Sequence, residues 1–446
     1  MSMDKKKPLG PLAQIKELEN DPKLLKLVAE HLPPNYDFEI AKTVWRIRKT
    51  ANCQTVALQM PEGLLLFATK VATVLTELTG VEAILMGDIT YGACCIDDFT
   101  ASMLGAQLLV HYGHSCLVPT TVANRIETIY VFVTIKYNVD HAIETIAKLL
   151  TDPEPAAESK NVESARRHIK IEEENSRAVL NVSLVSTIQF AYSLPVIKQA
   201  LEKSENDKNV QVNIPRSKPL SNGEILGCTA PTVKDDVIVY VGDGRFHLEA
   251  MMMANPEINA YRYDPYNKTL TLEQFDHEAL HKARGKELGM LQSSSKRLTI
   301  GIILGTLGRQ GNPKPLEHVY QQLAKKHSCF VVLMSEVIPA KLNLMQGVDL
   351  WVQFACPRLS IDWGSAFAVP ILTPFEAIWG MENSVSYSTD KCCNKGQGDC
   401  GQDSCTRKAA EYNGHPMDYY AYDSLGPHTP NYMPASNSKP RVRAVN

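Results

Sequence analysis

Cysteines are the residues whose number and spacing first suggest chemistry in this sequence. The chain of 446 residues contains 11 of them, which is an odd number. In a long chain of ordinary composition an odd set is a poor disulfide framework, so metal or redox chemistry is the better interpretation. Three of the cysteines lie in loops beside predicted strands, at nearly equal spacing along the chain: Cys94, Cys228 and Cys356.

The residues around these three cysteines are small or rigid. Gly92 and Ala93 precede Cys94, Gly227 precedes Cys228, and Ala355 and Pro357 flank Cys356. Such loops let the backbone come close to a bulky inorganic group. Thiolates are soft ligands that select iron–sulfur clusters, copper(I) or zinc, and a four-iron cluster with three protein ligands keeps one iron open for a substrate. The alternative is that these cysteines are small buried hydrophobic residues, and spacing alone does not decide between the two.

Three segments of the chain repeat one pattern, in which short apolar runs alternate with amphipathic helical stretches. Helical spacing brings Val71, Val74, Leu75 and Leu78 onto one face in the first segment, and similar sets recur near Leu194 and Leu316. The apolar runs predict strands at 55–60, 82–86, 107–112 and 128–135, at 178–185, 210–214, 236–241 and 261–263, and at 298–304, 329–334, 348–354 and 369–372.

This alternation predicts an α/β fold of three similar domains, each a small parallel-sheet βαβ unit, with a site between them. In open α/β sheets ligands collect at the carboxyl ends of the strands. The predicted organisation is a partly disordered N-terminal arm over 1–35, domains over 36–150, 151–292 and 293–425, a Cys-rich insertion at about 379–415 and a disordered tail over 426–446. One short helix is expected in the arm, around Leu24–His31.

The charge balance excludes some classes of partner. The 46 Lys and Arg residues nearly balance the 49 Asp and Glu residues, giving a net charge of −3. No overall field would draw the chain onto nucleic acid or an anionic membrane. No apolar run approaches a membrane span, and no apolar stretch follows the basic start as in a secretory signal, so we expect a cytoplasmic protein.

Several longer motifs resemble a known family. In order along the chain they are PEGLLLFA, GDITYGACCIDDFTA, LVHYGHSCLVP, GEILGCTAP, GDGRFHLE, AYRYDPY, GTLGRQGNP, ACPRLSIDWG and PMDYYAYDSLGP. Together they closely resemble the first-subunit family of eukaryotic 2-(3-amino-3-carboxypropyl)histidine synthase, which acts in diphthamide biosynthesis. The resemblance runs from about Lys42 to Pro427.

The resemblance implies a cofactor, a reaction and partners. In this family each of three α/β domains contributes one cysteine to a [4Fe-4S] cluster, and the matching positions are Cys94, Cys228 and Cys356; Cys95 adjoins the first and does not hold the motif position. The family uses S-adenosylmethionine as a substrate. A radical reaction at the cluster transfers its 3-amino-3-carboxypropyl group to C2 of a histidine imidazole in elongation factor 2. Its expected partners are that factor, a paralogous second subunit in a heterodimer and a small metal-binding electron donor.

The amino-carboxylate of S-adenosylmethionine needs hydrogen-bond donors that fit a planar anion. Arg358, two residues after Cys356, and Gln310 are our candidates, with Arg309 beside Gln310 as a further possibility. The alternative for each is a structural hydrogen-bonding role. No G-x-x-x-x-G-K-[ST] motif is present, so the Gly-rich loop around Gln310 does not indicate a nucleoside triphosphatase.

Other residues with chemical potential have simpler interpretations. We expect His111, His114 and His247 to be packed or to brace loops. Asp97, Asp98 and Asp243 could bind substrate or cap helices and turns. The late cysteines Cys392, Cys393, Cys400 and Cys405, with His415 after them, match no closed zinc pattern and favour a solvated loop with reactive thiols over a metal site. Cys53, Cys116 and Cys329 have no evident role.

One alternative function remains at this point. The chain could be a non-catalytic scaffold subunit that binds a cluster or zinc and supports the chemistry of a partner. Cleavage of S-adenosylmethionine to methylthioadenosine distinguishes the enzyme from the scaffold.

Overall fold

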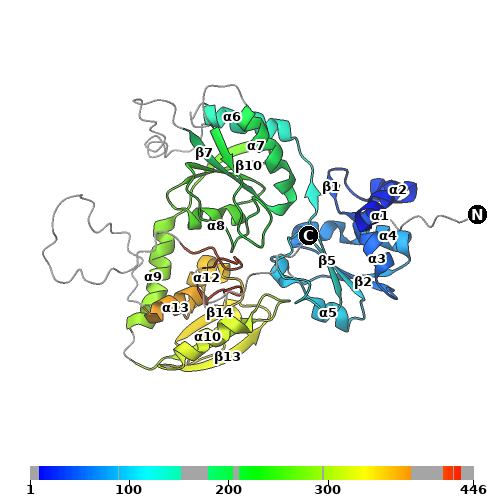
Figure 1. Cartoon of the computed structure of the whole chain (residues 1–446). Helices are drawn as coiled ribbons and strands as arrows, with labels where there is room; N and C mark the ends of the chain where they lie inside the picture. Colours follow the sequence, from blue (N-terminus) through cyan, green and yellow to red (C-terminus); the bar gives the residue numbers. More distant parts are fainter. Residues whose placement is uncertain are drawn as a thin grey trace, which may run out of the picture. The chain divides into compact units, whose positions relative to one another are not determined.

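The structure is a computed structural model that describes residues 10–88, 90–151, 179–203, 210–293, 296–382, 415–424 and 426–432. The chain divides into two compact units. Unit 1 comprises Met1–Asn138 and Ile188–Ser193, and unit 2 comprises Val139–Thr187 and Leu194–Asn446. Figure 1 colours the chain from blue in unit 1 to red near the C-terminus.

Unit 1 is built around a four-stranded parallel sheet in the order β3-β2-β4-β5. Its strands are β2 (Thr55–Gln59), β3 (Glu82–Met86), β4 (Leu108–Tyr112) and β5 (Glu127–Val131). The central strands β2 and β4 are almost wholly buried, as expected for a parallel sheet covered on both faces. Helix α4 (Leu65–Thr79) crosses from β2 to β3 and ends at Gly80, whose φ of 78° favours a residue without Cβ.

Smaller elements complete unit 1. Strand β1 (Tyr36–Asp37) pairs antiparallel with β6 (Thr134–Ile135). The remaining elements are α3 (Ile40–Lys49), the short 3-10 helices η1 (Glu62–Leu64), η2 (Ala93–Cys95) and η4 (Ile188–Ser193), and α5 (Asp98–Met103).

The N-terminal region is more structured than the sequence suggests. We expected an arm over residues 1–35 with one helix, but two helices form there, α1 (Pro11–Leu18) and α2 (Pro22–His31). Leu24 and Leu27 of α2 are buried in the core of the first sheet, and α2 packs against α4. Burial of these leucines stabilises the segment by about 1.5–3 kcal/mol for each side chain. The expected helix near Leu24–His31 is therefore confirmed, and its apolar face belongs to the core.

The second sheet has five strands in the order β11-β10-β9-β7-β8 and lies in unit 2. Its strands are β7 (Leu180–Ser186), β8 (Val210–Asn213), β9 (Val237–Val241), β10 (Asn259–Asp264) and β11 (Thr269–Glu273). Its helices are α6 (Val139–Thr151), α7 (Leu194–Lys203) and α8 (Phe246–Ala254), drawn in cyan and green in Figure 1.

Strand β11 is the one element of this sheet that the sequence analysis missed. It pairs antiparallel with β10 across a tight turn. The Asp264 carboxylate accepts bonds from the backbone nitrogens of Tyr266 and Asn267 at 2.9 and 3.1 Å, which fixes the turn. A turn-forming stretch with Asp, Pro and Asn, followed by the alternating TLTLE run, is typical of a β-hairpin. This pattern would have predicted β11 from the sequence.

The third sheet is parallel, in the order β13-β12-β14-β15, and also belongs to unit 2. Its strands are β12 (Thr299–Gly305), β13 (Ser328–Met334), β14 (Leu350–Phe354) and β15 (Ile371–Leu372). Its helices are α9 (His277–Ser293), α10 (Pro313–Leu323), α11 (Pro339–Leu342), α12 (Arg358–Trp363), η5 (Gly364–Ala366) and α13 (Pro374–Glu382).

A buried arginine joins four elements around the third sheet. Arg284 of α9 has about 1% of its surface exposed and donates to both carboxylate oxygens of Glu376 at 2.7 and 2.6 Å. It also donates to Glu287 and to the backbone oxygens of Ser360 and Ile371 at 2.8–3.0 Å. All five N–H groups of the guanidinium are thereby used, which is what burial of a charged group requires.

The predicted α/β class is confirmed, with one mostly parallel sheet within each of the three predicted domain ranges. The second and third sheets share one compact unit, so the division into three similar domains stays a prediction. In the predicted tail, His428 and Thr429 are buried, and the tail beyond residue 432 lies outside the described residues. None of the helices in the described part of the chain has the length and apolar character needed to cross a membrane.

Candidate functional site

The three candidate cysteines lie in loops near the carboxyl ends of parallel strands. Cys94 is in η2, between β3 and β4, and Cys356 follows β14 by two residues. The loop before Cys228 runs beside the end of β7, where Ser186 exchanges backbone bonds with Gly223 and Ile225 at 2.8 and 3.1 Å. This is the edge where α/β sheets bind ligands. None of the three cysteines is in a disulfide bond.

The Cys94 loop is tightly packed. Cys94 and Cys95 are both buried, with their sulfur atoms 4.0 Å apart, and the contact with Cys94 lowers the pKa of the Cys95 thiol. A Cβ on Gly92 would lie 3.7 Å from the Cys94 sulfur, so the chain passes close to this thiol. The choice of Cys94 over Cys95 as the cluster ligand rests on the motif and stays a prediction.

A buried network of hydrogen bonds at the end of β2 holds this loop in place. Gln59 donates from Nε2 to the backbone oxygen of Cys95 at 2.9 Å, and its Oε1 accepts from the backbone nitrogen of Asp97 at 3.2 Å. His111 lies 2.9 Å from the same Oε1 through Nδ1 and 3.0 Å from His114 through Nε2. Burial holds the pKa of His111 well below its usual value, so it is neutral. The expected bracing role of His111 is therefore what its contacts provide.

The Cys228 loop is a tight turn. Leu226 and Thr229 exchange two backbone bonds, at 2.9 and 3.3 Å, on either side of Gly227 and Cys228. A Cβ on Gly227 would collide with the ring of Phe246 at the start of α8, so a larger residue at this position would have to displace that ring.

A segment near the C-terminus, Met417–Tyr420, runs along the Cys228 loop. The Tyr419 nitrogen donates to the backbone oxygen of Cys228 at 3.2 Å, and the Tyr420 nitrogen donates to the Thr229 hydroxyl at 3.1 Å. Met417 in turn accepts from the backbone nitrogen of Ala230 at 2.8 Å. The PMDYYAYDSLGP motif, to which sequence reasoning gave no role, thus holds the Cys228 loop in place.

The Cys356 loop is held by a second buried glutamine. Gln353 of β14 donates from Nε2 to the backbone oxygen of Cys356 at 2.9 Å and to the Ser360 hydroxyl at 3.0 Å. Its Oε1 accepts from the backbone nitrogen of Ala355 at 2.8 Å. The side chain is completely buried, so the geometry of the turn is set by the core of the third sheet.

Arg358 links the Cys356 loop to the Cys228 loop within unit 2. Its Nη1 donates to the backbone oxygens of Gly227 and Phe246 at 3.3 and 2.8 Å, and its guanidinium carbon lies 4.2 Å from the centre of the Phe246 ring. Its other nitrogens pair with Glu249 at 2.6 Å and with both oxygens of Asp362 at 2.9 Å. These contacts use four of the five guanidinium N–H groups, and the expected role of Arg358 in substrate binding stays a prediction.

Gln310 lies beside the Cys356 loop, as expected if it contacts the amino-carboxylate of S-adenosylmethionine. It is about 3% exposed, and a Cβ on Gly305 would lie 3.2 Å from its Oε1 and 2.7 Å from the Cβ of Ala355. Glycine at the end of β12 therefore makes room for Gln310 next to Cys356. The structure brings Gln310, Arg358 and Cys356 to the same end of the third sheet.

Two of the other polar candidates, Asp97 and Asp98, make structural hydrogen bonds. Asp97 caps α5 by accepting from the Thr100 nitrogen at 2.9 Å, and Asp98 accepts from the Arg125 nitrogen at 3.1 Å. Burial and the nearby charge of Arg358 lower the pKa of His247 to about 4. Burial raises the pKa of Asp243.

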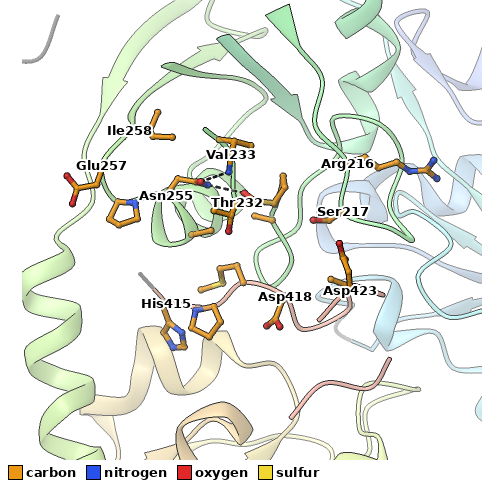
Figure 2. Close-up of a pocket in the computed structure, with 17 residues that line it drawn as sticks. Arg216, Ser217, Thr232, Val233, Asn255, Glu257, Ile258, His415, Asp418 and Asp423 are labelled. Carbon is orange, nitrogen blue, oxygen red and sulfur yellow. Dashed lines mark hydrogen bonds between the residues drawn. The ribbon is translucent and has the colours of Figure 1, made fainter. Parts of the chain in front are cut away.

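A pocket of about 720 Å³ adjoins the Cys228 loop in unit 2 (Figure 2). One wall is fixed by Asn255, whose side chain bonds to the backbone of Val233 and Pro231 at 2.8 and 3.0 Å. The wall residues are Arg216, Ser217, Ala230–Val233, Ala254–Ile258, His415–Asp418, Ala421 and Asp423. The pocket thus begins two residues after Cys228 and shares the C-terminal segment that holds this cysteine.

The remaining metal-binding candidates are limited. Within each unit, the described residues contain no group of three or more His, Cys, Asp and Glu side chains that could hold a metal ion. Cys392, Cys393, Cys400 and Cys405 lie outside the described residues. Cys94 belongs to unit 1 and the other two candidates to unit 2, so the convergence of the three thiols stays a prediction.

Known proteins with similar sequences show which family this chain belongs to. A family model described as a putative diphthamide synthesis protein matches residues 60–391, a range that contains all three candidate cysteines. The chain belongs to the diphthamide synthesis family. Its relatives include proteins named 2-(3-amino-3-carboxypropyl)histidine synthase subunit 1. Those of Nematostella vectensis and Homo sapiens are 46% and 45% identical, over 94% and 90% of this chain and 77% and 79% of theirs. That of Caenorhabditis elegans is 43% identical over 94% of this chain and 92% of its own length.

The fold of this diphthamide synthesis family member also matches solved structures. The crystal structure of Dph2 from Pyrococcus horikoshii aligns with a TM-score of 0.58 and 23% identity, covering 77% of this chain and 90% of that one. The structure of the same protein with a 4Fe-4S cluster aligns with a TM-score of 0.59 and 24% identity. The fold is therefore shared with Dph2.

Proposed function

We propose that this chain is the catalytic subunit of the first enzyme of diphthamide synthesis. It transfers the 3-amino-3-carboxypropyl group of S-adenosylmethionine to C2 of a histidine imidazole in elongation factor 2, with methylthioadenosine as the second product. The observation that carries the proposal is the placement of Cys94, Cys228 and Cys356. Each lies near the carboxyl end of a parallel strand, and each loop has a cysteine backbone oxygen held by a donor from elsewhere in the chain.

The donor set fits an iron–sulfur cluster. None of the three cysteines is in a disulfide bond, and Gly92 leaves the backbone close to the sulfur of Cys94. Three cysteine ligands suit a four-iron cluster with one open iron. Dph2 of Pyrococcus horikoshii has been solved with a 4Fe-4S cluster, which supports the proposal that a cluster of this kind binds here. When bound, the cluster would supply the electron that breaks the sulfonium bond to the aminocarboxypropyl chain.

The protein's own residues must orient S-adenosylmethionine so that the correct carbon–sulfur bond reacts. Gln310 is the better placed of the two candidates, because its buried amide lies beside the Cys356 loop. We propose that it contacts the amino-carboxylate of the substrate. Arg358 would join it through Nη2, which also donates to Glu249.

The proposal includes partners and a location. Relatives bear the name subunit 1, which supports a complex with a second, paralogous subunit. Elongation factor 2 is the protein substrate, and a small metal-binding protein supplies electrons. We propose that the reaction takes place in the cytoplasm.

Anaerobic purification tests the cluster. We expect the wild-type protein to contain iron and sulfide with the visible absorbance of an iron–sulfur protein, and Cys228→Ala to lose most of it. Cys329→Ala is the matched control, because Cys329 lies in β13 away from the candidate loops. Iron-free wild-type protein that still modified the histidine would overturn the proposal. Cluster-loaded protein that formed no methylthioadenosine with reductant and the second subunit would favour the scaffold function instead.

A further inference from the structure

Two buried glutamines in different sheets each donate one hydrogen bond to the backbone of a cysteine loop and accept one from it. Gln59 is the last residue of β2 in unit 1 and is about 2% exposed. Its amide nitrogen donates to the backbone oxygen of Cys95 at 2.9 Å, and its amide oxygen accepts from the backbone nitrogen of Asp97 at 3.2 Å. The amide therefore spans the turn that follows Cys94.

Gln353 repeats this arrangement in unit 2, near the end of β14. It is 0% exposed, donates to the backbone oxygen of Cys356 at 2.9 Å and accepts from the backbone nitrogen of Ala355 at 2.8 Å. The two glutamines thus occupy the same kind of place, at the carboxyl end of a central parallel strand. Each reaches the cysteine loop through one donor and one acceptor.

Only a carboxamide provides this combination in a short, uncharged side chain. A carboxylate has no donor for the cysteine carbonyl, and methionine has the same reach but neither strong donor nor strong acceptor. The two amides can be buried because the nitrogen and the oxygen of each are hydrogen-bonded. The backbone of each loop, and with it the direction of the thiol, is therefore fixed from the core of its own sheet.

We propose that Gln59 and Gln353 are positioning residues that hold the Cys94 and Cys356 loops in the shape needed to bind the cluster. The inference rests on the proposed function, since it assigns the two glutamines to the support of its cluster ligands. Outer hydrogen bonds that orient metal ligands commonly change metal affinity by on the order of 10- to 100-fold when removed. They also tune the reduction potential of iron–sulfur clusters.

The test compares Gln59→Met and Gln353→Met with a matched control, Gln107→Met. The side-chain amide of Gln107 also hydrogen-bonds to the backbone as both donor and acceptor, but it lies at the amino ends of the strands of the first sheet. It accepts from the backbone nitrogens of Gln54 and Thr55, both at 2.8 Å, and donates to Gly105. We measure the rate of iron loss to a chelator, together with the electron paramagnetic resonance spectrum and the reduction potential of the cluster, in anaerobic full-length protein.

We expect iron loss to accelerate by on the order of 10-fold or more in each of the two variants, with a changed spectrum or potential, and to stay at the wild-type rate in the control. Wild-type rates, spectrum and potential in both variants would overturn the inference. If either methionine variant does not fold, Gln59→Leu or Gln353→Leu replaces it, because leucine is also uncharged and lacks both the donor and the acceptor.

A second measurement separates this inference from the proposed function. In cluster-free protein, we expect Cys356 to be alkylated faster in Gln353→Met than in wild type, and Cys94 faster in Gln59→Met. Unchanged alkylation rates in folded variants would count against the positioning role. Wild-type protein that binds no iron would instead contradict the proposed function, whatever the alkylation rates.

Discussion

Arg358 donates from Nη1 to the backbone oxygen of Gly227 across 3.3 Å, and so ties the loop of one candidate ligand to that of another within unit 2. Gly227 precedes Cys228, and Arg358 begins the helix that follows Cys356. The guanidinium is about 3% exposed and is also paired with Glu249 and Asp362. This contact gives Arg358 two possible roles that an experiment can separate.

Arg358→Lys keeps the charge but loses the planar fork that reaches Gly227, Phe246 and Glu249 together. If Arg358 holds the loops, iron loss to a chelator accelerates by on the order of 10-fold without any substrate present. If it binds the substrate carboxylate, the KM for S-adenosylmethionine rises and iron loss stays unchanged. Arg245→Lys, at a half-exposed arginine just before α8, is the control and should change neither quantity.

Tyr419→Pro removes the backbone N–H that donates to the Cys228 oxygen. One hydrogen bond contributes about 1 kcal/mol, which corresponds to roughly fivefold in the opening of the loop. We therefore expect Cys228 to be alkylated several times faster in the cluster-free variant. The control is Tyr422→Pro, which removes a similar bond to the Lys218 oxygen. Equal rates in wild type and Tyr419→Pro would show that the C-terminal segment does not hold this loop.

Replacement of Arg284 tests the buried network of the third sheet. Arg284→Met leaves the carboxylates of Glu376 and Glu287 without their common partner, and breaking a buried ion pair in this way costs about 3–5 kcal/mol. We expect a clear fall in the urea midpoint of unfolding. Lys341→Met, which breaks an exposed pair with Glu336, should cost under about 1 kcal/mol. Similar midpoints for the two variants would refute the importance of the network.

His415 predicts how stability depends on pH. Burial lowers its pKa to about 4, against the opposing effect of the Glu376 carboxylate. The folded protein disfavours the protonated form of His415. The contribution of neutral His415 to stability is therefore fully present above about pH 6.5, the pKa expected in the unfolded chain, and is lost as the pH falls towards 4. At pH 5 the loss is about 2 kcal/mol.

The variant His415→Gln cannot take up this proton. We expect its thermal midpoint to fall less than that of the wild type between pH 7 and pH 5. An equal fall in both proteins would mean that His415 does not cause the change, and that other buried histidines such as His111 do.

The sequence predicts well what depends on local periodicity. The apolar runs that became β2, β9 and β14 were recognisable because central parallel strands are buried on both faces. The helices from Leu65 and Leu194 followed from spacing alone. The cysteines stood out because their neighbours are small and because the motifs around them belong to a family.

What the sequence could not predict depends on contacts between distant residues. Gln59 and Gln353 look like ordinary polar residues at strand ends, and only the fold reveals that each bonds to a cysteine loop. The partner of Arg358 in the Cys228 loop lies 131 residues away in the chain. Helix α1 was missed because its helical pattern is short and none of its residues is fully buried, although it packs against α3.

The proposed function is tested most directly by measuring the mass of the acceptor histidine in elongation factor 2. Cluster-loaded protein is incubated anaerobically with S-adenosylmethionine, a reductant and the second subunit, and the target peptide is analysed by mass spectrometry. We expect a 3-amino-3-carboxypropyl group on that histidine and equimolar methylthioadenosine, both absent with Cys94→Ala, Cys228→Ala or Cys356→Ala. An unmodified histidine with the cluster intact, or full modification by all three alanine variants, would contradict the proposed function.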